Sequence, residues 1–303
     1  MLQESIALGE LKATAAMERR RGAAVTRAQA LEVRARREGA ALDKVGRAPS
    51  AGLLIAEGDS WFDYPFHDVL KGLEDLHGYD VESVAHKGDR VEDMAYSDGQ
   101  LDEFTRRIEK MIRRGDRPRA VLLSGGGNDI AGDEFGMLLN HALSARSGLN
   151  RRVVEGIIDE RLYDAYATII SAVTEVCQQM LGDKIPIVVH GYAYAVADGR
   201  GFWGGGWILP GPWLEPGFAQ KGYVHLDQRQ PLVRELIDKF NAMLQKLKAA
   251  PEFTHVRYVD LRADLQTYPE DYAIAWANEL HPNAQGFATV AARFAEQLRE
   301  LSP

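Results

Sequence analysis

Three short polar segments of this chain, each following an apolar run, carry groups that can take part in acyl transfer. They read GDSW (residues 58–61), HKGD (86–89) and GGGND (125–129). Together they offer a serine hydroxyl, a glycine N–H with no side chain in front of it, and an asparagine amide. A serine that attacks a carbonyl needs donors aimed at the developing oxyanion, and such donors typically contribute about 2.7 to 4 kcal/mol each.

A serine nucleophile also needs a base, and the sequence ANELHPN (277–283) places His281 in a loop before a helix that Pro282 would open. A neutral imidazole can take the serine proton and return it to the leaving group. Each segment alone has a plainer explanation. Asp59 and Ser60 are good caps for a following helix, GGGND can be a turn, and a histidine in a loop usually lies on the surface.

Apolar runs typical of strands alternate with stretches that have the periodicity of amphipathic helices. These strands and helices must position the polar segments. We expect strands at Leu53–Glu57, Val81–Ala85, Ala120–Ser124, Ile185–His190 and Val256–Asp260. The amphipathic stretches between them predict an α/β protein with a parallel sheet covered on both faces. Ligands bind outside the carboxyl ends of such strands. The segments after the first three strands would therefore meet at one edge of the sheet.

The set resembles the SGNH hydrolases, also called the GDSL esterase and lipase superfamily, over about residues 52 to 303. The four blocks of that family are matched by Ser60 in Gly-Asp-Ser, Gly88, Asn128 in Gly-x-Asn-Asp, and His281 before a proline. The resemblance implies a flavodoxin-like three-layer sandwich with a five-stranded parallel sheet. It also implies Ser60 as nucleophile, His281 as base, and an oxyanion hole made of the Ser60 N–H, the Gly88 N–H and the Asn128 side chain.

The chain departs from the family pattern at two places. The residues before Gly88 are His and Lys, where the family usually has an Asn shortly before its Gly. The acid of the Asp-x-x-His-Pro block falls on Asn278, which cannot carry the charge that stabilises an imidazolium. The Asn278 oxygen can still accept the Nδ1 proton of His281, or a backbone carbonyl or Glu279 can do so, although a glutamate more often faces solvent. We expect activity to survive.

Two regions lie outside this pattern. Residues 1–48 hold good helix formers and an excess of basic residues, and we expect a helical arm that packs against the body or against a second subunit of a homo-oligomer. Residues 49–303 would form the hydrolase-like domain. Its Trp- and Gly-rich insertion at 192–226 is typical of a lid, a binding loop or an interface.

The leading interpretation is a serine esterase that hydrolyses an acyl ester, with acetyl among the candidate acyl groups, through an acyl-enzyme intermediate. The alternative is a hydrolase-like domain whose catalysis Asn278 has weakened and which acts as a carbohydrate-binding or interaction module. Trp61, Trp203 and Trp207 are candidates for binding a small-molecule, glycan or lipid ester, because aromatic faces suit acyl, aryl and sugar groups. For Trp61, core packing is an equal alternative.

Other functional classes find little support in the sequence. The histidines show no HxH or HExxH spacing, no phosphate-binding motif follows the first strand, and we expect no metal or organic cofactor. The acidic main domain argues against nucleic acid. No apolar run of about 18 residues predicts a transmembrane segment, and the first residues do not resemble a secretory signal. With one cysteine, Cys177, a cytoplasmic location is the expectation.

Overall fold

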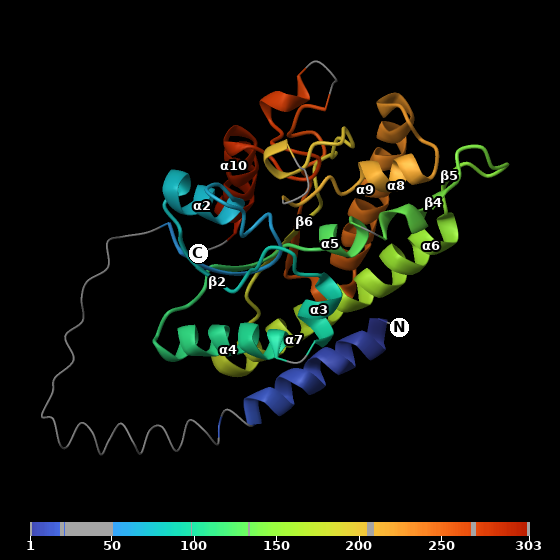
Figure 1. The fold of residues 1–303 in the computed structure, drawn as a ribbon. Helices are drawn as coiled ribbons and strands as arrows, with labels where there is room; N and C mark the ends of the chain where they lie inside the picture. The colour runs from blue at the N-terminus through green and yellow to red at the C-terminus, as the bar shows by residue number, and fades with distance from the viewer. Residues whose placement is uncertain are drawn as a thin grey trace, which may run out of the picture.

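A five-stranded parallel sheet forms the centre of the computed structural model, which describes residues 2–18, 21, 51–97, 99–132, 134–204, 209–267 and 271–301 (Figure 1). In spatial order the strands are β2 (Asp80–Ser83), β1 (Leu53–Glu57), β3 (Ala120–Leu123), β6 (Ile187–His190) and β7 (Val256–Val259). This is the strand order of flavodoxin-like folds. The predicted fold class is therefore confirmed, and each strand overlaps the one expected at its position.

The register of the sheet brings the ends of neighbouring strands to the same edge. Ala56 of β1 lies beside Ser83 of β2 and Leu122 of β3, and Leu123 lies beside Val189 of β6. The segments that follow β1, β2 and β3 therefore start at one edge. β3 and β6 are buried along their whole length, as expected of parallel strands with helices on both faces.

Helices cover both faces of the sheet. α2 (Val69–His77) and α10 (Ala284–Glu300) pack together on one face, and α3 (Val91–Tyr96), α4 (Gln100–Arg113) and α7 (Tyr163–Leu181) lie on the other (Figure 1). α9 (Leu226–Lys248) packs against α7, β6 and β7. Within the described residues, no helix combines the length and the apolar character that crossing a bilayer requires.

Shorter elements connect these layers. They are α5 (Gly127–Ile130), β4 (Leu139–Asn140), β5 (Gly148–Leu149), α6 (Arg151–Glu155), a π-helical segment (Gly156–Leu162), α8 (Glu215–Gln220), and 3₁₀ turns at Phe135–Leu138, Phe202–Gly204, Pro251–Phe253 and Tyr272–Ile274. β4 and β5 pair antiparallel in a small second sheet. The insertion expected at 192–226 lies between β6 and α9 and contains α8, so it separates the sheet from the helix that follows it in the chain.

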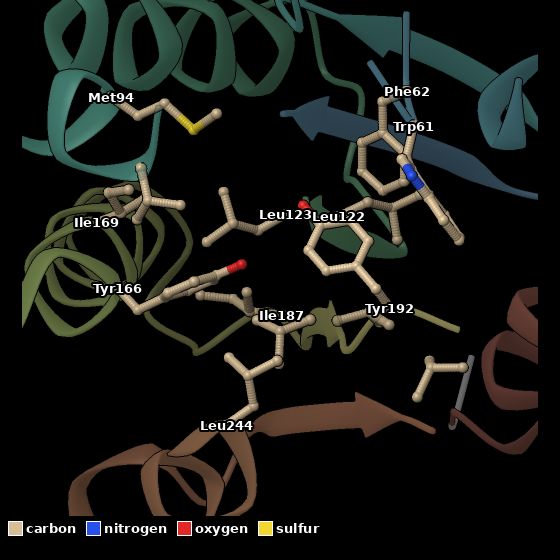
Figure 2. Packing of buried hydrophobic residues seen from close by; sticks show 14 of the residues in the cluster. Trp61, Phe62, Met94, Leu122, Leu123, Tyr166, Ile169, Ile187, Tyr192 and Leu244 are labelled. Atoms are coloured by element: carbon tan, nitrogen blue, oxygen red, sulfur yellow. The ribbon is translucent and has the colours of Figure 1, made fainter. Parts of the chain in front are cut away.

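The core forms where the inner faces of the helices meet the central strands. In α4 the buried apolar residues recur at intervals of three and four, which is the spacing of one helical face: Leu101, Phe104, Ile108 and Met111. Figure 2 shows Leu123 of β3 and Ile187 of β6 close to Tyr166 of α7, with Leu244 of α9 on the same side of the cluster. These four side chains are almost completely buried, so α7 and α9 are held against the strands that carry the site.

The N-terminal helix, residues 2–18, packs against the body of the protein. Gly9 allows close approach to α7, because a Cβ there would lie 2.4 Å from the carbonyl oxygen of Thr168. Lys12 Nζ donates to the carbonyl of Ala95 in α3 at 2.9 Å, and Met17 is buried. Residues 2–18 of the predicted arm therefore pack against the body, as one of the two alternatives expected. Apart from residue 21, the remainder of the arm lies outside the described residues.

Glu57, the last residue of β1, is a buried carboxyl group directly before the GDSW segment. It is 1% exposed, and its Oε1 accepts the N–H of Gly58 at 3.0 Å, while its Oε2 has no hydrogen-bond partner among the described residues. Burial raises the pKa of Glu57 from 4.5 to about 9. The side chain is therefore uncharged at neutral pH.

The raised pKa predicts how stability depends on pH. Above pH 4.5 the unfolded chain loses the Glu57 proton while the native protein keeps it until about pH 9, so the native state binds more protons and stability falls with rising pH across this window. The fall approaches about 1.4 kcal/mol per pH unit. In Glu57→Gln, which mimics the protonated form, this part of the pH dependence should vanish. Urea unfolding between pH 5 and 9 measures the free energy of unfolding of the parent protein and of Glu57→Gln. If the difference between the two proteins stays constant with pH, the pKa of Glu57 is not raised.

Candidate active site

The chain turns sharply after β1 and carries Ser60 at the edge of the sheet. Gly58 has no room for a side chain, because a Cβ there would lie 2.7 Å from the Cβ of Ser124. The residues that follow form a turn, and the next helix, α2, begins only at Val69. The prediction that Asp59 and Ser60 cap a helix is therefore wrong. The reason is that the chain makes only an isolated turn here, and the helix that follows has Asp68 as its N-cap.

Asp59 holds this turn through side-chain and backbone donors. Its Oδ1 accepts the N–H of Trp61 at 3.0 Å and the hydroxyl of Ser124 at 2.7 Å, and its Oδ2 accepts the hydroxyl of Tyr192. The same Tyr192 oxygen accepts the N–H of Gly127 at 3.1 Å. One tyrosine thus connects the loop of the serine to the loop of GGGND. Since Asp59 is 1% exposed, its role here is structural.

Ser60, His281 and Asn278 form a continuous hydrogen-bonded set. Ser60 Oγ lies 2.7 Å from His281 Nε2, and His281 Nδ1 lies 3.0 Å from Asn278 Oδ1. The order nucleophile, base and orienting group is that of a catalytic triad, with an amide in place of the usual carboxylate. The structure therefore brings together the three residues that the sequence predicted as catalytic, although Ser60 lies more than 200 positions before the other two.

Three hydrogen bonds fix the orientation of the Asn278 amide. Oδ1 accepts the backbone N–H groups of Leu280 at 3.0 Å and His281 at 2.9 Å, whereas Nδ2 donates to the hydroxyl of Tyr64 at 3.0 Å. A reversed amide would turn its NH₂ group toward two N–H donors. Oδ1 therefore faces Nδ1 of His281, which must carry the ring proton to donate. This leaves the lone pair of Nε2 toward Ser60.

His281 is enclosed by aromatic rings. Tyr64 stacks on the imidazole with 4.3 Å between ring centroids, and Trp213 approaches it edge-on at 5.4 Å. The histidine is 6% exposed, and burial lowers its pKa from 6.5 to about 3. The neutral, proton-accepting form is therefore the resting state at neutral and mildly acidic pH.

Of the three predicted oxyanion donors, the Ser60 N–H lies in the turn after β1, and Gly88 and Asn128 lie in the loops after β2 and β3. Asn128 Nδ2 donates to the carbonyl of Asp89 at 2.9 Å, and Asp129 accepts the N–H of Val91 at 2.9 Å. These two bonds hold the loop that contains Gly88 against the loop that contains Asn128. An amide group has two N–H hydrogens, so Asn128 keeps one for a substrate oxygen.

A cavity of about 70 Å³ opens beside the nucleophile, and Ser60, Asn128 and His281 all contribute to its lining. The wall is otherwise mainly apolar. Concave apolar sites with a few convergent polar groups are typical of small-molecule binding. The arrangement can hold an ester carbonyl between a hydroxyl, an imidazole and an amide donor.

The three tryptophans predicted to bind substrate lie in different surroundings. Trp61 is 3% exposed and donates from its indole nitrogen to the carbonyl of Leu280 at 3.1 Å, so it packs in the core, although one part of it lines the cavity. Trp203 is 77% exposed and lies in a separate hollow that also contains Tyr64. Trp207 lies outside the described residues.

Glu279 is buried, and the expectation that it faces solvent is wrong. Its Oε1 accepts the N–H groups of Gly199 and Glu215, both at 3.0 Å, and its Oε2 accepts those of Trp213 at 2.7 Å and Leu214 at 2.8 Å. These four bonds occupy both oxygens, so the carboxylate does not orient His281. Glu279 anchors the insertion beside the active site. One of the residues that it holds is Trp213, whose ring contacts the imidazole of His281.

Sequence reasoning did not single out the two tyrosines of the site. Tyr64 lies four residues after Ser60, and Tyr192 lies two residues after the end of β6. Both tyrosines follow strands whose carboxyl ends lie at the edge of the sheet that carries Ser60. This position in the sequence could have identified them as candidates for the site. In the part of the chain that the structure describes, no cluster of His, Cys, Asp or Glu could hold a metal ion.

Comparison with known families agrees with this geometry. Residues 50–289 match the GDSL-like lipase/acylhydrolase family. The chain belongs to this family, and it is a hydrolase of ester bonds. No curated protein sequence matches the chain.

Solved structures of low sequence identity were also found. A single-site variant of Axe2, an acetyl-xylooligosaccharide esterase from Geobacillus stearothermophilus, is 16% identical, with 84% of this chain and 96% of that chain covered and a TM-score of 0.45. A lipolytic protein of the G-D-S-L family from Veillonella parvula is 16% identical, with 82% and 99% covered and a TM-score of 0.43.

The neutral partner of His281 predicts a distinctive pH profile. In Asn278→Asp, a carboxylate beside Nδ1 stabilises the imidazolium, so the pKa of His281 rises from about 3. The acid limb of kcat/KM should then move to higher pH, while kcat/KM at pH 7 should increase about 10-fold or more. Hydrolysis of p-nitrophenyl acetate from pH 4 to 9 measures both effects. A slower Asp variant, or an unmoved acid limb, would contradict the assigned role of Asn278.

The anchoring role of Glu279 predicts a loss of stability and of order in the insertion. Glu279→Gln replaces one accepting oxygen by an NH₂ group, so two of the four N–H donors lose their acceptor, at a cost of about 2 to 4 kcal/mol in the free energy of unfolding. Limited proteolysis should cleave between residues 199 and 215 faster than in the parent protein. Glu235→Gln, an exposed position on α9, serves as control. Equal unfolding and cleavage in the two variants would refute the anchor.

Proposed function

We propose that the protein hydrolyses acyl esters by nucleophilic catalysis, with Ser60 as nucleophile and His281 as base. The observation that carries the proposal is the 2.7 Å contact between Ser60 Oγ and His281 Nε2, together with the Asn278 oxygen that holds the Nδ1 proton. These contacts leave the lone pair of a buried, neutral imidazole directed at the hydroxyl that must lose its proton.

The first half-reaction forms an acyl-enzyme. Nε2 of His281 takes the hydroxyl proton of Ser60 while Oγ attacks the ester carbonyl, and the tetrahedral oxyanion accepts hydrogen bonds from Asn128 Nδ2 and the backbone N–H groups of Ser60 and Gly88. When the ester C–O bond breaks, the imidazolium returns the proton to the departing alcohol. The acyl group is then bound to Ser60 Oγ.

The second half-reaction regenerates the serine. His281 takes a proton from water as the water oxygen attacks the acyl carbonyl, and the same oxyanion donors stabilise the second tetrahedral intermediate. Collapse of this intermediate breaks the bond to Ser60 Oγ, which recovers its proton from the imidazolium, and the carboxylic acid leaves. Asn278 keeps Nδ1 protonated throughout, and it stabilises the imidazolium through its dipole instead of a full charge.

Covalent labelling tests this proposal directly. A fluorophosphonate probe should modify Ser60 in the parent protein, and Ser60→Ala should abolish labelling and reduce ester hydrolysis by about 10³-fold or more. Ser144→Ala, at an exposed serine, is the control and should retain both. If a protein that is folded by circular dichroism shows neither labelling nor hydrolysis, the domain is a binding module and not an active esterase.

A further inference from the structure

Polar and apolar residues both line the cavity beside Ser60. The polar groups of the site, Ser60, Asn128 and His281, form part of the lining. The rest includes apolar side chains from the α9 helix and from the end of α5, namely Ile130, Ala131, Val233, Leu236, Ile237 and Phe240. A pocket that joins a nucleophile to an apolar wall suits an acyl chain better than a polar alcohol.

The buried polar side chains that line the cavity, Asp59 and Tyr192, already have hydrogen-bond partners within the protein. Within this cavity the carboxylate of Asp59 accepts bonds from Trp61, Ser124 and Tyr192, and the Tyr192 oxygen also accepts the N–H of Gly127. These groups have little capacity left for a hydroxyl or a charge. A polar group bound here would lose its hydrogen bonds to water and gain too few from the protein to replace them. The cavity therefore favours an apolar group.

Phe240 forms a rigid part of the cavity wall. It packs against the backbone of Gly126, where a Cβ would lie 2.5 Å from the ring, and Gly126 has a φ of +102° that favours glycine. Phe240 also stacks on Tyr192, with 5.5 Å between ring centroids. The ring cannot move without disturbing the loop that carries Asn128. This part of the wall is therefore fixed by the fold.

We propose that this pocket binds the acyl group of the substrate and selects a short, unbranched apolar chain of about four carbons, with Ile237 setting its length. The inference rests on the proposed role of Ser60 as nucleophile. An apolar cavity of about 150 Å³ accommodates the six carbons of benzene, so the cavity volume of about 70 Å³ holds about three carbons. With the carbonyl carbon at Ser60, the matching acyl group is butyryl, and the alcohol part of the ester remains outside.

A series of p-nitrophenyl esters from acetate to octanoate tests the proposal. Two buried methylenes should raise kcat/KM about 10-fold from acetate to butyrate, and octanoate should fall below butyrate because its chain exceeds the cavity volume of about 70 Å³. Ile237 is half-buried, so it accepts substitution. Ile237→Ala should move the optimum to hexanoate, and Ile237→Phe should move it to acetate. Leu232→Ala, on the same helix but outside the cavity lining, should leave the profile unchanged.

The outcomes separate this inference from the proposed function. Hydrolysis of every ester with acetate preferred, or a chain-length profile that Ile237→Ala and Ile237→Phe leave in place, overturns the acyl pocket and leaves the esterase intact. Absence of hydrolysis and of fluorophosphonate labelling at Ser60 overturns both. An optimum at butyrate that moves in opposite directions in the two Ile237 variants supports the pocket.

Discussion

The account of this protein depends on a single hydrogen bond between two neutral groups, from Nδ1 of His281 to Oδ1 of Asn278. In most triads of this kind a carboxylate orients the histidine and also stabilises the imidazolium. Here the amide supplies orientation and a dipole but no charge. The structure compensates by fixing both ends of the amide, with two backbone N–H groups on Oδ1 and the Tyr64 hydroxyl on Nδ2. The ring tautomer needed for general-base catalysis is therefore specified by geometry.

The site is assembled from loops that follow different strands, so its precision depends on bonds between these loops. Tyr192 connects the loop of Ser60 with that of Gly127, and Asp129 connects the loop after β3 with the start of α3. Glu279 joins the His281 loop to the insertion through four backbone N–H groups. Each of these acceptors is a buried or partly buried polar group that removal would leave with unpaired donors. The same bonds therefore stabilise the fold and align the reacting atoms.

Much of this arrangement could be predicted from the sequence, and the remainder shows why some of it could not. Apolar runs with polar segments after them located the strands, and strand ends located Ser60 and Asn128. The His-Pro segment before the last helix located His281. The burial of Glu279 could not be predicted, because it depends on N–H groups more than 60 residues away in an irregular insertion. The expected helix cap at Asp59 was wrong for a related reason, since Asp59 holds an isolated turn in place through the distant Ser124 and Tyr192 as well as through the N–H of Trp61. Side chains whose partners are distant in sequence leave no periodic signal.

The protonation of the His281 ring is the property that tests this account most directly. Nitrogen-15 NMR of labelled protein reports the protonation of Nδ1 and Nε2 separately. The account predicts a proton on Nδ1 and none on Nε2 at pH 6, with titration of the ring only near its lowered pKa of about 3. An imidazolium at pH 6, or a neutral ring with its proton on Nε2, would show that Asn278 does not hold the histidine as a base for Ser60.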